Sequence, residues 1–422
     1  MAVQRRNFVA LDAFSKTEEE ARVRTSGGGL ISLLCVVSAV VLLWREWAQF
    51  RAVTTDPMLV IDRDHELPLK LTLDITFPAM PCALLGLDIM DESGNVQLDV
   101  LFDQFTKTRV DVNGNMVGGS ASEPYKPNSL SGKRAGAKDL QMDADYCGSC
   151  YGSKNQENNA ELPPEQRICC QTCDDVHDAY LEAGWAFFDG ANIEQCESEG
   201  YVKRIQEQLH EGCNVKGTAL LNRIQGNLHF APGKPYQQLA AGMPGQGLGH
   251  YHDVSLYERN RHMNLNHVIN EFRFGEDPQS EIVAQKIQRS APLEDTVASL
   301  ENPHYYIFNY YTNVVPTRYE FLGASKPLDT AQYSATYHDR PIMGGRDADH
   351  PTTLHGRGGT PGVYFNLEFS PLKIINRERR PQQWSTLLLN WITTIGGILA
   401  VGTVTDKVVY KAQRSIGAKK QL

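Results

Sequence analysis

Two long apolar runs, one near each end of the chain, limit what this sequence can fold into. Residues 384–404 (WSTLLLNWITTIGGILAVGTV) contain no ionisable side chain. At about 1.5 Å per helical residue, such a run can cross a hydrocarbon core of about 30 Å. Glycines at 396, 397 and 402 would allow another helix to approach closely. Residues 27–44 (GGGLISLLCVVSAVVLLW) are also uncharged. We therefore expect a protein held in the lipid bilayer by two transmembrane helices.

The first run has a second interpretation, a cleaved signal peptide. It is longer than the apolar core of most signal peptides, and no small-residue cleavage site follows it cleanly. A retained signal anchor is the favoured interpretation. The chain then divides into a cytosolic arm, a first span, a large domain, a second span and a tail, at residues 1–26, 27–44, 45–383, 384–404 and 405–422.

The cysteines indicate on which side of the membrane the large domain lies. The basic residues that flank the two spans do not decide this, because they are almost evenly balanced. Eight of the nine cysteines lie in the large domain: Cys82, Cys147, Cys150, Cys169, Cys170, Cys173, Cys196 and Cys213. An even, clustered set is typical of an oxidising compartment. The large domain is therefore predicted to be luminal, with both termini in the cytosol.

The large domain has the pattern of a β-rich fold. Apolar residues recur at every second position in residues 69–75, which is the period of a half-buried strand. Further strand-like runs occupy residues 83–91, 96–102, 217–230, 266–274, 305–321, 333–337 and 363–369. Several short strands separated by loops predict a β-sandwich.

The cysteine block interrupts this pattern and admits three interpretations. Disulfide bridges are favoured. A zinc site is the second, because Cys-x-x-Cys pairs have ligand spacing, and a thiol-exchange site is the third. The connectivity cannot be deduced from the sequence. Helical patterns at residues 174–188 and 201–209 predict a disulfide-stapled helical insertion at about residues 141–214.

A histidine-rich stretch holds His250, His252, His262 and His267. As a metal site its pattern is weak, and surface histidines are the favoured interpretation. A pH-sensing role is also plausible, since histidine titrates near about 6.5. No catalytic motif is present, so the sequence predicts no enzyme, no cofactor and no metal. The formal net charge of −9 argues against nucleic acid as a partner.

The last four residues, Lys419-Lys420-Gln421-Leu422, have the spacing of a cytosolic dilysine retrieval signal. An ordinary basic flank of a membrane helix is the alternative. The signal depends on position, and here the two lysines stand third and fourth from the end of the chain.

Several stretches together resemble a known family. They include residues 11–29 (LDAFSKTEEEARVRTSGGG), 147–152 (CGSCYG), 169–185 (CCQTCDDVHDAYLEAGW), 313–321 (NVVPTRYEF) and 361–374 (PGVYFNLEFSPLKI). In these segments the chain is similar to the Erv46, or ERGIC-3 type, subunits of the Erv41–Erv46 cargo receptors. The cysteine block is the most specific part of the resemblance.

The resemblance implies a receptor of the endoplasmic reticulum (ER), the ER–Golgi intermediate compartment and the cis-Golgi. It implies a hetero-oligomer with an Erv41-like subunit, packaging in COPII vesicles, return by COPI, and capture of escaped ER residents that is favoured by acid. Lys419 and Lys420 match the family's dilysine signal. The family's exit signal includes an aromatic pair in the tail, for which the nearest candidates here are Val409 and Tyr410.

The resulting hypothesis places luminal cargo proteins on a surface near the cysteine block, carried by Tyr151, Trp185, Phe187 and Phe188. Two other functions stay open. One is a membrane-anchored luminal thiol–disulfide oxidoreductase that uses Cys147/Cys150 or Cys170/Cys173, and the other is a purely structural membrane scaffold.

Overall fold

The computed structural model divides the chain into two compact units, which are described separately. One holds residues 1–56 with 378–422, and the other holds residues 57–377. The structure describes residues 26–64, 67–92, 96, 104–117, 123–124, 146–159, 161–239, 248–278, 281–287, 290–301, 303–324, 326–346, 352 and 354–419. The predicted arm at residues 1–26 and most of the strand predicted at residues 96–102 lie outside these ranges.

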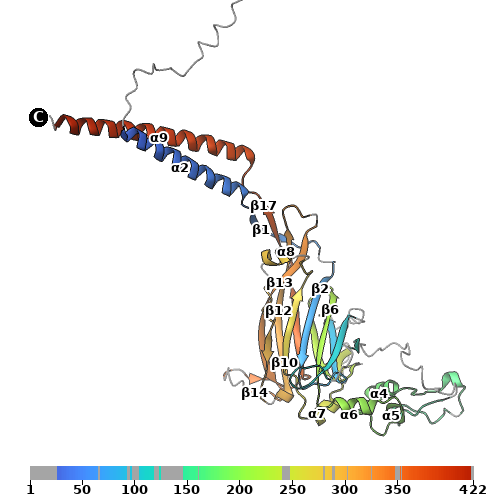
Figure 1. Ribbon diagram of the computed structural model, residues 1–422. Helices are drawn as coiled ribbons and strands as arrows, with labels where there is room; N and C mark the ends of the chain where they lie inside the picture. The colour runs from blue at the N-terminus through green and yellow to red at the C-terminus, as the bar shows by residue number, and fades with distance from the viewer. Residues whose placement is uncertain are drawn as a thin grey trace, which may run out of the picture. The chain divides into compact units, whose positions relative to one another are not determined.

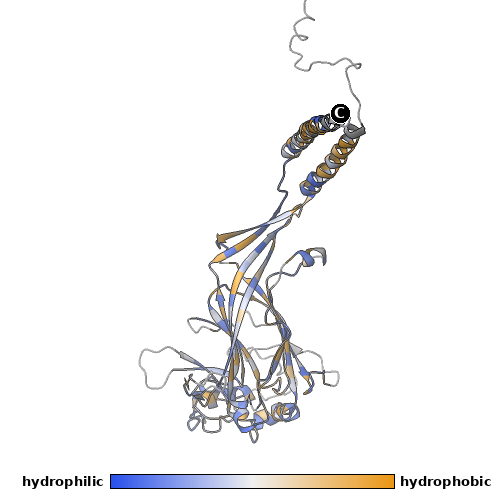
Figure 2. Ribbon diagram, turned by 90° about the vertical axis from the view of Figure 1, so that its left-hand side faces the viewer, coloured by the Kyte–Doolittle hydropathy of each residue, from blue (hydrophilic) through white to orange (hydrophobic). Residues whose placement is uncertain are grey.

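The first unit is a pair of helices, α2 (Ser26–Arg51) and α9 (Trp384–Lys419), which run side by side (Figure 1). Figure 2 shows both helices largely in the colour of apolar residues. Each is long and apolar enough to cross a membrane, over Gly28–Arg51 and Trp384–Ala412. The helices extend beyond the predicted spans because helical backbone continues into the polar flanks.

Aromatic packing joins the two helices at one end. The ring centroid of Trp47 lies 6.2 Å from those of Trp384 and Trp391. Farther along, a Cβ added at Gly402 would lie 2.6 Å from Cys35 Sγ. One of the three glycines noted in the sequence therefore does permit a close approach between the helices. The other two, Gly396 and Gly397, have no such neighbour.

The second unit is a β-sandwich of a seven-stranded and a six-stranded sheet (Figure 1). The first sheet has the order β1-β17-β12-β16-β7-β3, with β13 also paired to β12. Its strands are β1 (Thr54–Ile61), β3 (Leu85–Asp91), β7 (Gly226–Pro232), β12 (Tyr306–Glu320), β13 (Leu328–Pro341), β16 (Gly362–Phe369) and β17 (Leu372–Arg379).

The second sheet has the order β11-β10-β2-β6-β4-β5. Its strands are β2 (Leu69–Phe77), β4 (Phe105–Val110), β5 (Glu123–Pro124), β6 (Gly212–Leu221), β10 (His267–Phe274) and β11 (Thr296–Ala298). Two small hairpins pair β8 (Pro235–Leu239) with β9 (Leu248–His252), and β14 (Gly345–Arg346) with β15 (Leu354–His355). Short helices α7 (Ser255–Arg259), α8 (Glu281–Lys286) and η3 (Pro303–Tyr305) lie in the connections.

The core forms where the two sheets face each other. In β2 every second side chain is buried, as the alternation predicts. The rings of Phe272 in β10 and Phe365 in β16 stack at 4.8 Å, and those of Phe77 in β2 and Phe230 in β7 lie 5.1 Å apart. The predicted β-sandwich is confirmed. The run predicted at residues 217–230 is two strands, because the chain turns between Leu221 and Gly226.

Candidate functional site

The eight cysteines of the large domain form four disulfides, as expected: Cys82–Cys213, Cys147–Cys169, Cys150–Cys170 and Cys173–Cys196. The last three lie within residues 146–211, which we call the cysteine-rich module. The two cysteines of each Cys-x-x-Cys motif belong to different bridges. Neither motif therefore forms the internal disulfide that a thioredoxin-like exchange site uses.

The module contains the short helices η2 (Pro164–Gln166), α4 (Cys173–Glu182), α5 (Glu194–Ser198) and α6 (Tyr201–Gln208). Helix α4 begins with a capping box, in which Thr172 Oγ1 accepts from the Asp175 backbone and Asp175 accepts from the Thr172 backbone. The predicted helical face over residues 174–188 is confirmed only in part. The helix ends at Glu182, so Trp185 lies in the following loop.

The candidate cargo-surface residues differ in exposure. Trp185 and Phe188 are 47% and 41% exposed. Phe187 is only 3% exposed, because its ring stacks on His177 with the centroids 3.9 Å apart. The prediction that Phe187 belongs to an exposed surface is therefore wrong, since Phe187 is part of the module's core. Tyr151 is half-buried.

Two of these aromatic residues have unusual backbone conformations. Tyr151 and Phe188 have φ angles of 51° and 56°, in the left-handed region that non-glycine residues seldom occupy. The Phe188 N–H donates to Ser255 Oγ at 3.0 Å, and Tyr151 Oη accepts from the Glu194 N–H at 2.9 Å. Neighbouring elements thus hold both residues in place, and such strain is concentrated at functional sites.

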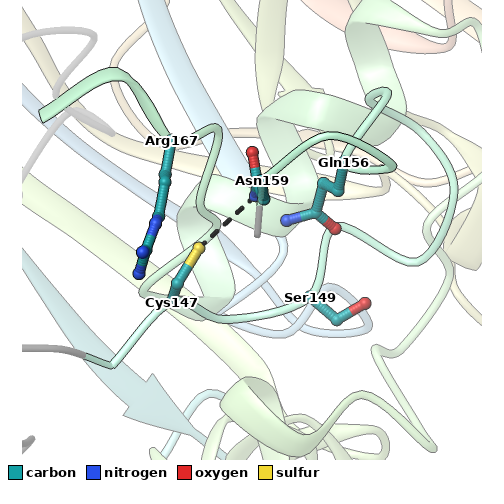
Figure 3. Close-up of a pocket in the computed structure, with 5 residues that line it drawn as sticks. All are labelled: Cys147, Ser149, Gln156, Asn159 and Arg167. Carbon is teal, nitrogen blue, oxygen red and sulfur yellow. Dashed lines mark hydrogen bonds between the residues drawn. The ribbon is translucent and has the colours of Figure 1, made fainter. Parts of the chain in front are cut away.

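A shallow pocket of about 380 Å³ opens at the Cys147–Cys169 bridge. Cys147, Ser149, Gln156, Asn159 and Arg167 line it, and in Figure 3 the Asn159 amide points toward the Cys147 sulfur. Asn159 Nδ2 lies 3.6 Å from Cys147 Sγ. The lining is polar and contains no pair of groups with the geometry of a nucleophile and its base.

One face of α4 attaches the module to the sandwich. The buried Lys234 Nζ lies 3.3 Å from Asp174 and 2.8 Å from Asp178, and His177 Nε2 lies 3.0 Å from Asp253. Burial alone would raise the pKa of Asp253, but hydrogen bonds from His177 and a neighbouring serine lower it below its usual value. These contacts fall on Lys234 and Asp253, beside the hairpin of β8 and β9.

That hairpin carries two of the candidate histidines. His250 and His252 lie on β9 and face Asp88 of β3 and His229 of β7. One ligand-type atom from each of the four lies within 4.8 Å of the others. The sequence pattern did not indicate Asp88 or His229, because each stands alone in its strand. Only the antiparallel register, which pairs Asp88 with His229, brings them together.

Burial changes what the histidines can do. It lowers the pKa of His229 to about 3, and the pKa values of His252 and His267 to about 4. His267 is also fixed by a contact of 2.8 Å between its Nε2 and the Tyr310 hydroxyl. Burial therefore disfavours protonation of His252 and His267 between about pH 7.2 and about pH 6.4 by lowering their pKa values, and the pH-sensing role of the candidate histidines stays a prediction. His262, in contrast, is exposed.

The candidate sorting residues lie at the end of the chain. Val409 and Tyr410 are on α9, where Tyr410 is 41% exposed. Lys419 is the last residue of α9, and Lys420 lies outside the described residues. The roles predicted for these four residues stay predictions.

Two apolar helices of membrane length, a β-sandwich and four disulfides together define a membrane protein of the secretory pathway, because stable disulfides form in oxidising compartments. A sequence profile described as "Endoplasmic reticulum vesicle transporter" matches residues 150–406, and one described as "Endoplasmic Reticulum-Golgi Intermediate Compartment (ERGIC)" matches residues 8–98. The chain belongs to this family of vesicle transport proteins of the ER and Golgi membranes.

Two curated relatives agree with this assignment. The chain is 51% identical to "ER-derived vesicles protein ERV46" of Saccharomyces cerevisiae, over 99% of this chain and 100% of that protein. It is 33% identical to "Probable endoplasmic reticulum-Golgi intermediate compartment protein 3" of Dictyostelium discoideum, over 97% and 96% of the two chains. The crystal structure of Erv41p is similar with a TM-score of 0.38 and 18% identity, covering 76% of this chain and 99% of that chain.

Proposed function

We propose that this protein is a non-catalytic cargo receptor that cycles between the ER and the Golgi and retrieves escaped ER residents. The observation that carries the proposal is the exposed aromatic loop of the cysteine-rich module, with Trp185 and Phe188 at 47% and 41% exposure. Exposed aromatic side chains on a rigid support are typical of protein-binding hot spots. The Cys173–Cys196 bridge, which closes the segment that contains this loop, supplies the rigidity.

The surface around Phe188 has a mixed chemistry that suits a polypeptide ligand. The Arg259 guanidinium lies 5.7 Å from the centroid of the Phe188 ring. Trp185 packs edge-on against Tyr180, with the centroids 5.6 Å apart, and leaves nearly half of its surface in solvent. A segment with an apolar side chain and a nearby carboxylate would complement this surface.

The proposed pH response is assigned to His262 with its neighbour His210. Both are exposed, and their ring centroids lie 4.7 Å apart. His262 Nε2 lies 2.9 Å from the Leu209 carbonyl oxygen. Glu211, the acidic residue that directly follows His210 in the chain, is paired with Arg109. Two adjacent exposed imidazoles are the proposed origin of the pH response, because histidine is the side chain whose ordinary pKa lies nearest this pH range.

Cargo capture tests the aromatic loop. The double variant Trp185→Ala/Phe188→Ala of the full-length protein is expected to bind ER-resident cargo at least about tenfold more weakly in detergent pull-downs. The matched control is Tyr311→Ala/Val297→Ala, which removes exposed apolar side chains from the sandwich (52% and 64% exposed). Equal capture by both double variants would show that the loop does not bind cargo.

The same assay tests the pH response. Wild-type binding is expected to be several-fold tighter at about pH 6.4 than at about pH 7.2. His210→Gln/His262→Gln should flatten this difference without abolishing binding. If binding by the variant still differs between the two pH values, groups other than these two histidines cause the response.

The tail is proposed to select the two coats, with Lys419 and Lys420 read by COPI, and Val409 and Tyr410 contributing to COPII packaging. In cells, Lys419→Ser/Lys420→Ser should move the protein to later compartments. The control Lys407→Ser/Lys411→Ser removes the same charge from the same tail and should not. If both variants move, only the basic character of the tail matters. Val409→Ala/Tyr410→Ala should instead accumulate in the ER.

An Erv41-like subunit is the proposed partner. Saccharomyces cerevisiae has both a protein 51% identical to this chain and "ER-derived vesicles protein ERV41", which is 24% identical over 86% of this chain. Two related chains in one organism suit a hetero-oligomer. Co-purification of the two from detergent, with loss of either when the other is deleted, is the expected result.

A thiol–disulfide oxidoreductase is the alternative function. One observation favours it, since the Cys147–Cys169 bridge is only half-buried and lies beside Arg167, whose charge would stabilise a thiolate. Turnover of a disulfide substrate that is lost in Cys147→Ser would establish it. Resistance of the body cysteines to alkylation without reductant would support structural bridges.

A further inference from the structure

Four side chains from three strands converge in the interior beside the cysteine-rich module. They are Asp88 (β3), His229 (β7), His250 and His252 (β9). The side chains of Asp88, His229 and His252 are at most 3% exposed, and that of His250 is 9% exposed. Because a buried polar group requires a partner, a cluster of this composition requires a physical explanation.

The hydrogen bonds of the outer ring nitrogens determine where the protons lie. His252 Nδ1 faces the Gly233 carbonyl oxygen at 3.4 Å, and a carbonyl oxygen only accepts, so this nitrogen carries the proton. His229 Nδ1 faces the Asn227 side-chain oxygen at 2.8 Å and carries its proton for the same reason. The inner Nε2 atoms of both rings therefore present lone pairs to the centre of the cluster.

The lone pairs of His252 and His229 face each other at close range, with their Nε2 atoms 3.2 Å apart. His250 Nε2 lies 3.2 Å from His252 Nε2, and among the described residues His250 Nδ1 has no hydrogen-bond partner. Two acceptors at this distance repel each other unless a proton or a metal cation lies between them. Protonating His229 on Nε2 instead would require Asn227 to turn its amide nitrogen toward His229 Nδ1.

The carboxylate completes the arrangement. Asp88 Oδ2 lies 3.4, 3.6 and 3.9 Å from the Nε2 atoms of His252, His250 and His229. Within the part of the chain that the structure describes, no group meets both the distance and the angle of a hydrogen bond to this buried oxygen, and His250 and His252 are its nearest imidazoles. It faces the same centre as the three imidazoles.

These five separations, from 3.2 to 3.9 Å, are close to those of ligands around one small ion. Zinc binds imidazole nitrogen and carboxylate oxygen at about 2.0–2.2 Å, and the edges of such a tetrahedron are about 3.3–3.6 Å long. We propose that Asp88, His229, His250 and His252 form a four-coordinate site for a divalent transition-metal ion of the zinc class.

The site has the features of a structural centre. All four ligands come from the protein, so no position is left open for a substrate. Asn227 and the Gly233 carbonyl orient two imidazoles through their second nitrogens, as outer-shell groups of metal sites do. Neutral imidazole is also the ligand form that zinc requires.

The location indicates what the ion stabilises. It would tie the β8–β9 hairpin to the edge of the seven-stranded sheet, since β3 is an end strand of that sheet. Asp253, which pairs with His177 of α4, directly follows His252, and Lys234, which pairs with Asp174 and Asp178, directly follows Gly233. The metal site would thus brace the support on which the cysteine-rich module rests.

Metal binding by the full-length protein in detergent tests the proposal. After chelator treatment and dialysis, the wild-type protein is expected to bind one Zn²⁺ per chain, measured by mass spectrometry of the metal. His250→Gln/His252→Gln should bind at least about 100-fold more weakly, because two of four ligands are lost. The control His210→Gln/His262→Gln also removes two histidines and should keep full affinity.

Cobalt distinguishes this site from one built on cysteines. Bound Co²⁺ should give the intense visible bands of four-coordinate geometry without the near-ultraviolet bands of thiolate ligation. If the double variant fails to fold, Asp88→Asn provides the test, because it keeps the side chain's size. It should shift the visible bands and weaken binding. Absence of stoichiometric Zn²⁺ in the wild-type protein, or unchanged affinity in both cluster variants, would overturn the proposal. Neither result depends on cargo capture.

Discussion

The sandwich and the cysteine-rich module compensate in different ways for the conformational entropy that a chain loses on folding. The core of the sandwich consists of large side chains packed between two sheets, among them Phe272, Phe365 and Tyr310. Half of the eight buried residues in the core of the module are cysteines. A short polar segment cannot bury enough apolar surface to compensate for its lost conformational entropy, so cross-links take the place of packing.

The backbone of the two regions differs in the same sense. In the sandwich, the backbone groups of neighbouring strands form hydrogen bonds with one another, as in the nine-residue register of β2 and β6. In the module, the side chains of Gln156 and Asn159 bond to the backbone of Ile168 and Cys150 instead. Loops held in this way can present side chains in conformations that a regular ladder would not allow, as at Tyr151 and Phe188.

Removing one core ring of the sandwich should have the largest effect. Phe365 is fully buried and stacks on Phe272 at 4.8 Å and on Tyr310 at 5.0 Å. Phe365→Ala should reduce the free energy of unfolding by about 3–5 kcal/mol through lost burial and a cavity. Thermal unfolding in detergent measures this, with the exposed Tyr311→Ala as control. A loss similar to that of the control would contradict the described core.

Removing one bridge of the module should have a smaller and more local effect. The double variant Cys150→Ala/Cys170→Ala opens a bridge that closes a short loop, which costs about 2–4 kcal/mol. Trypsin should then cut at Arg167 and Lys203 much faster, while the unfolding temperature of the sandwich changes little. If both regions lost protection together, they would form one cooperative unit rather than two.

The smallest effect is expected at the cap of α4. Thr172→Ala removes one half of the capping box between Cys170 and Cys173 and should cost about 1 kcal/mol. Thr172→Ser keeps the hydroxyl and serves as the control. Hydrogen exchange of the first turn of α4 reports the change. Protection equal in the two variants would mean that the disulfides alone fix the start of the helix.

The sequence was most informative where a pattern is local and periodic. The alternation in β2, the strands β10, β12 and β16 and the short helix α6 agree with the prediction closely, because burial on one face leaves a period of two or of 3.6 residues. The β4 strand was harder to see, because it lies next to a glycine- and asparagine-rich stretch that resembles a loop.

The candidate sites were predictable only in part. The cysteine content indicated disulfides, but the pairing depended on which loops lie together. Trp185 was correctly placed in the exposed region, whereas Phe187, two residues later, turns inward onto His177. No pattern of two or 3.6 residues distinguishes them, because the loop after α4 has no regular period.

The sequence alone determined the two apolar helices, the β-rich domain between them, the oxidising compartment and the family, because each depends on composition, local period or similarity along the chain. Only the tertiary structure decided the disulfide pairs and the grouping of Asp88 with His229, His250 and His252. The reason is that these residues lie up to about 160 positions apart, and only the register of the sheet and the packing of a hairpin bring their side chains together.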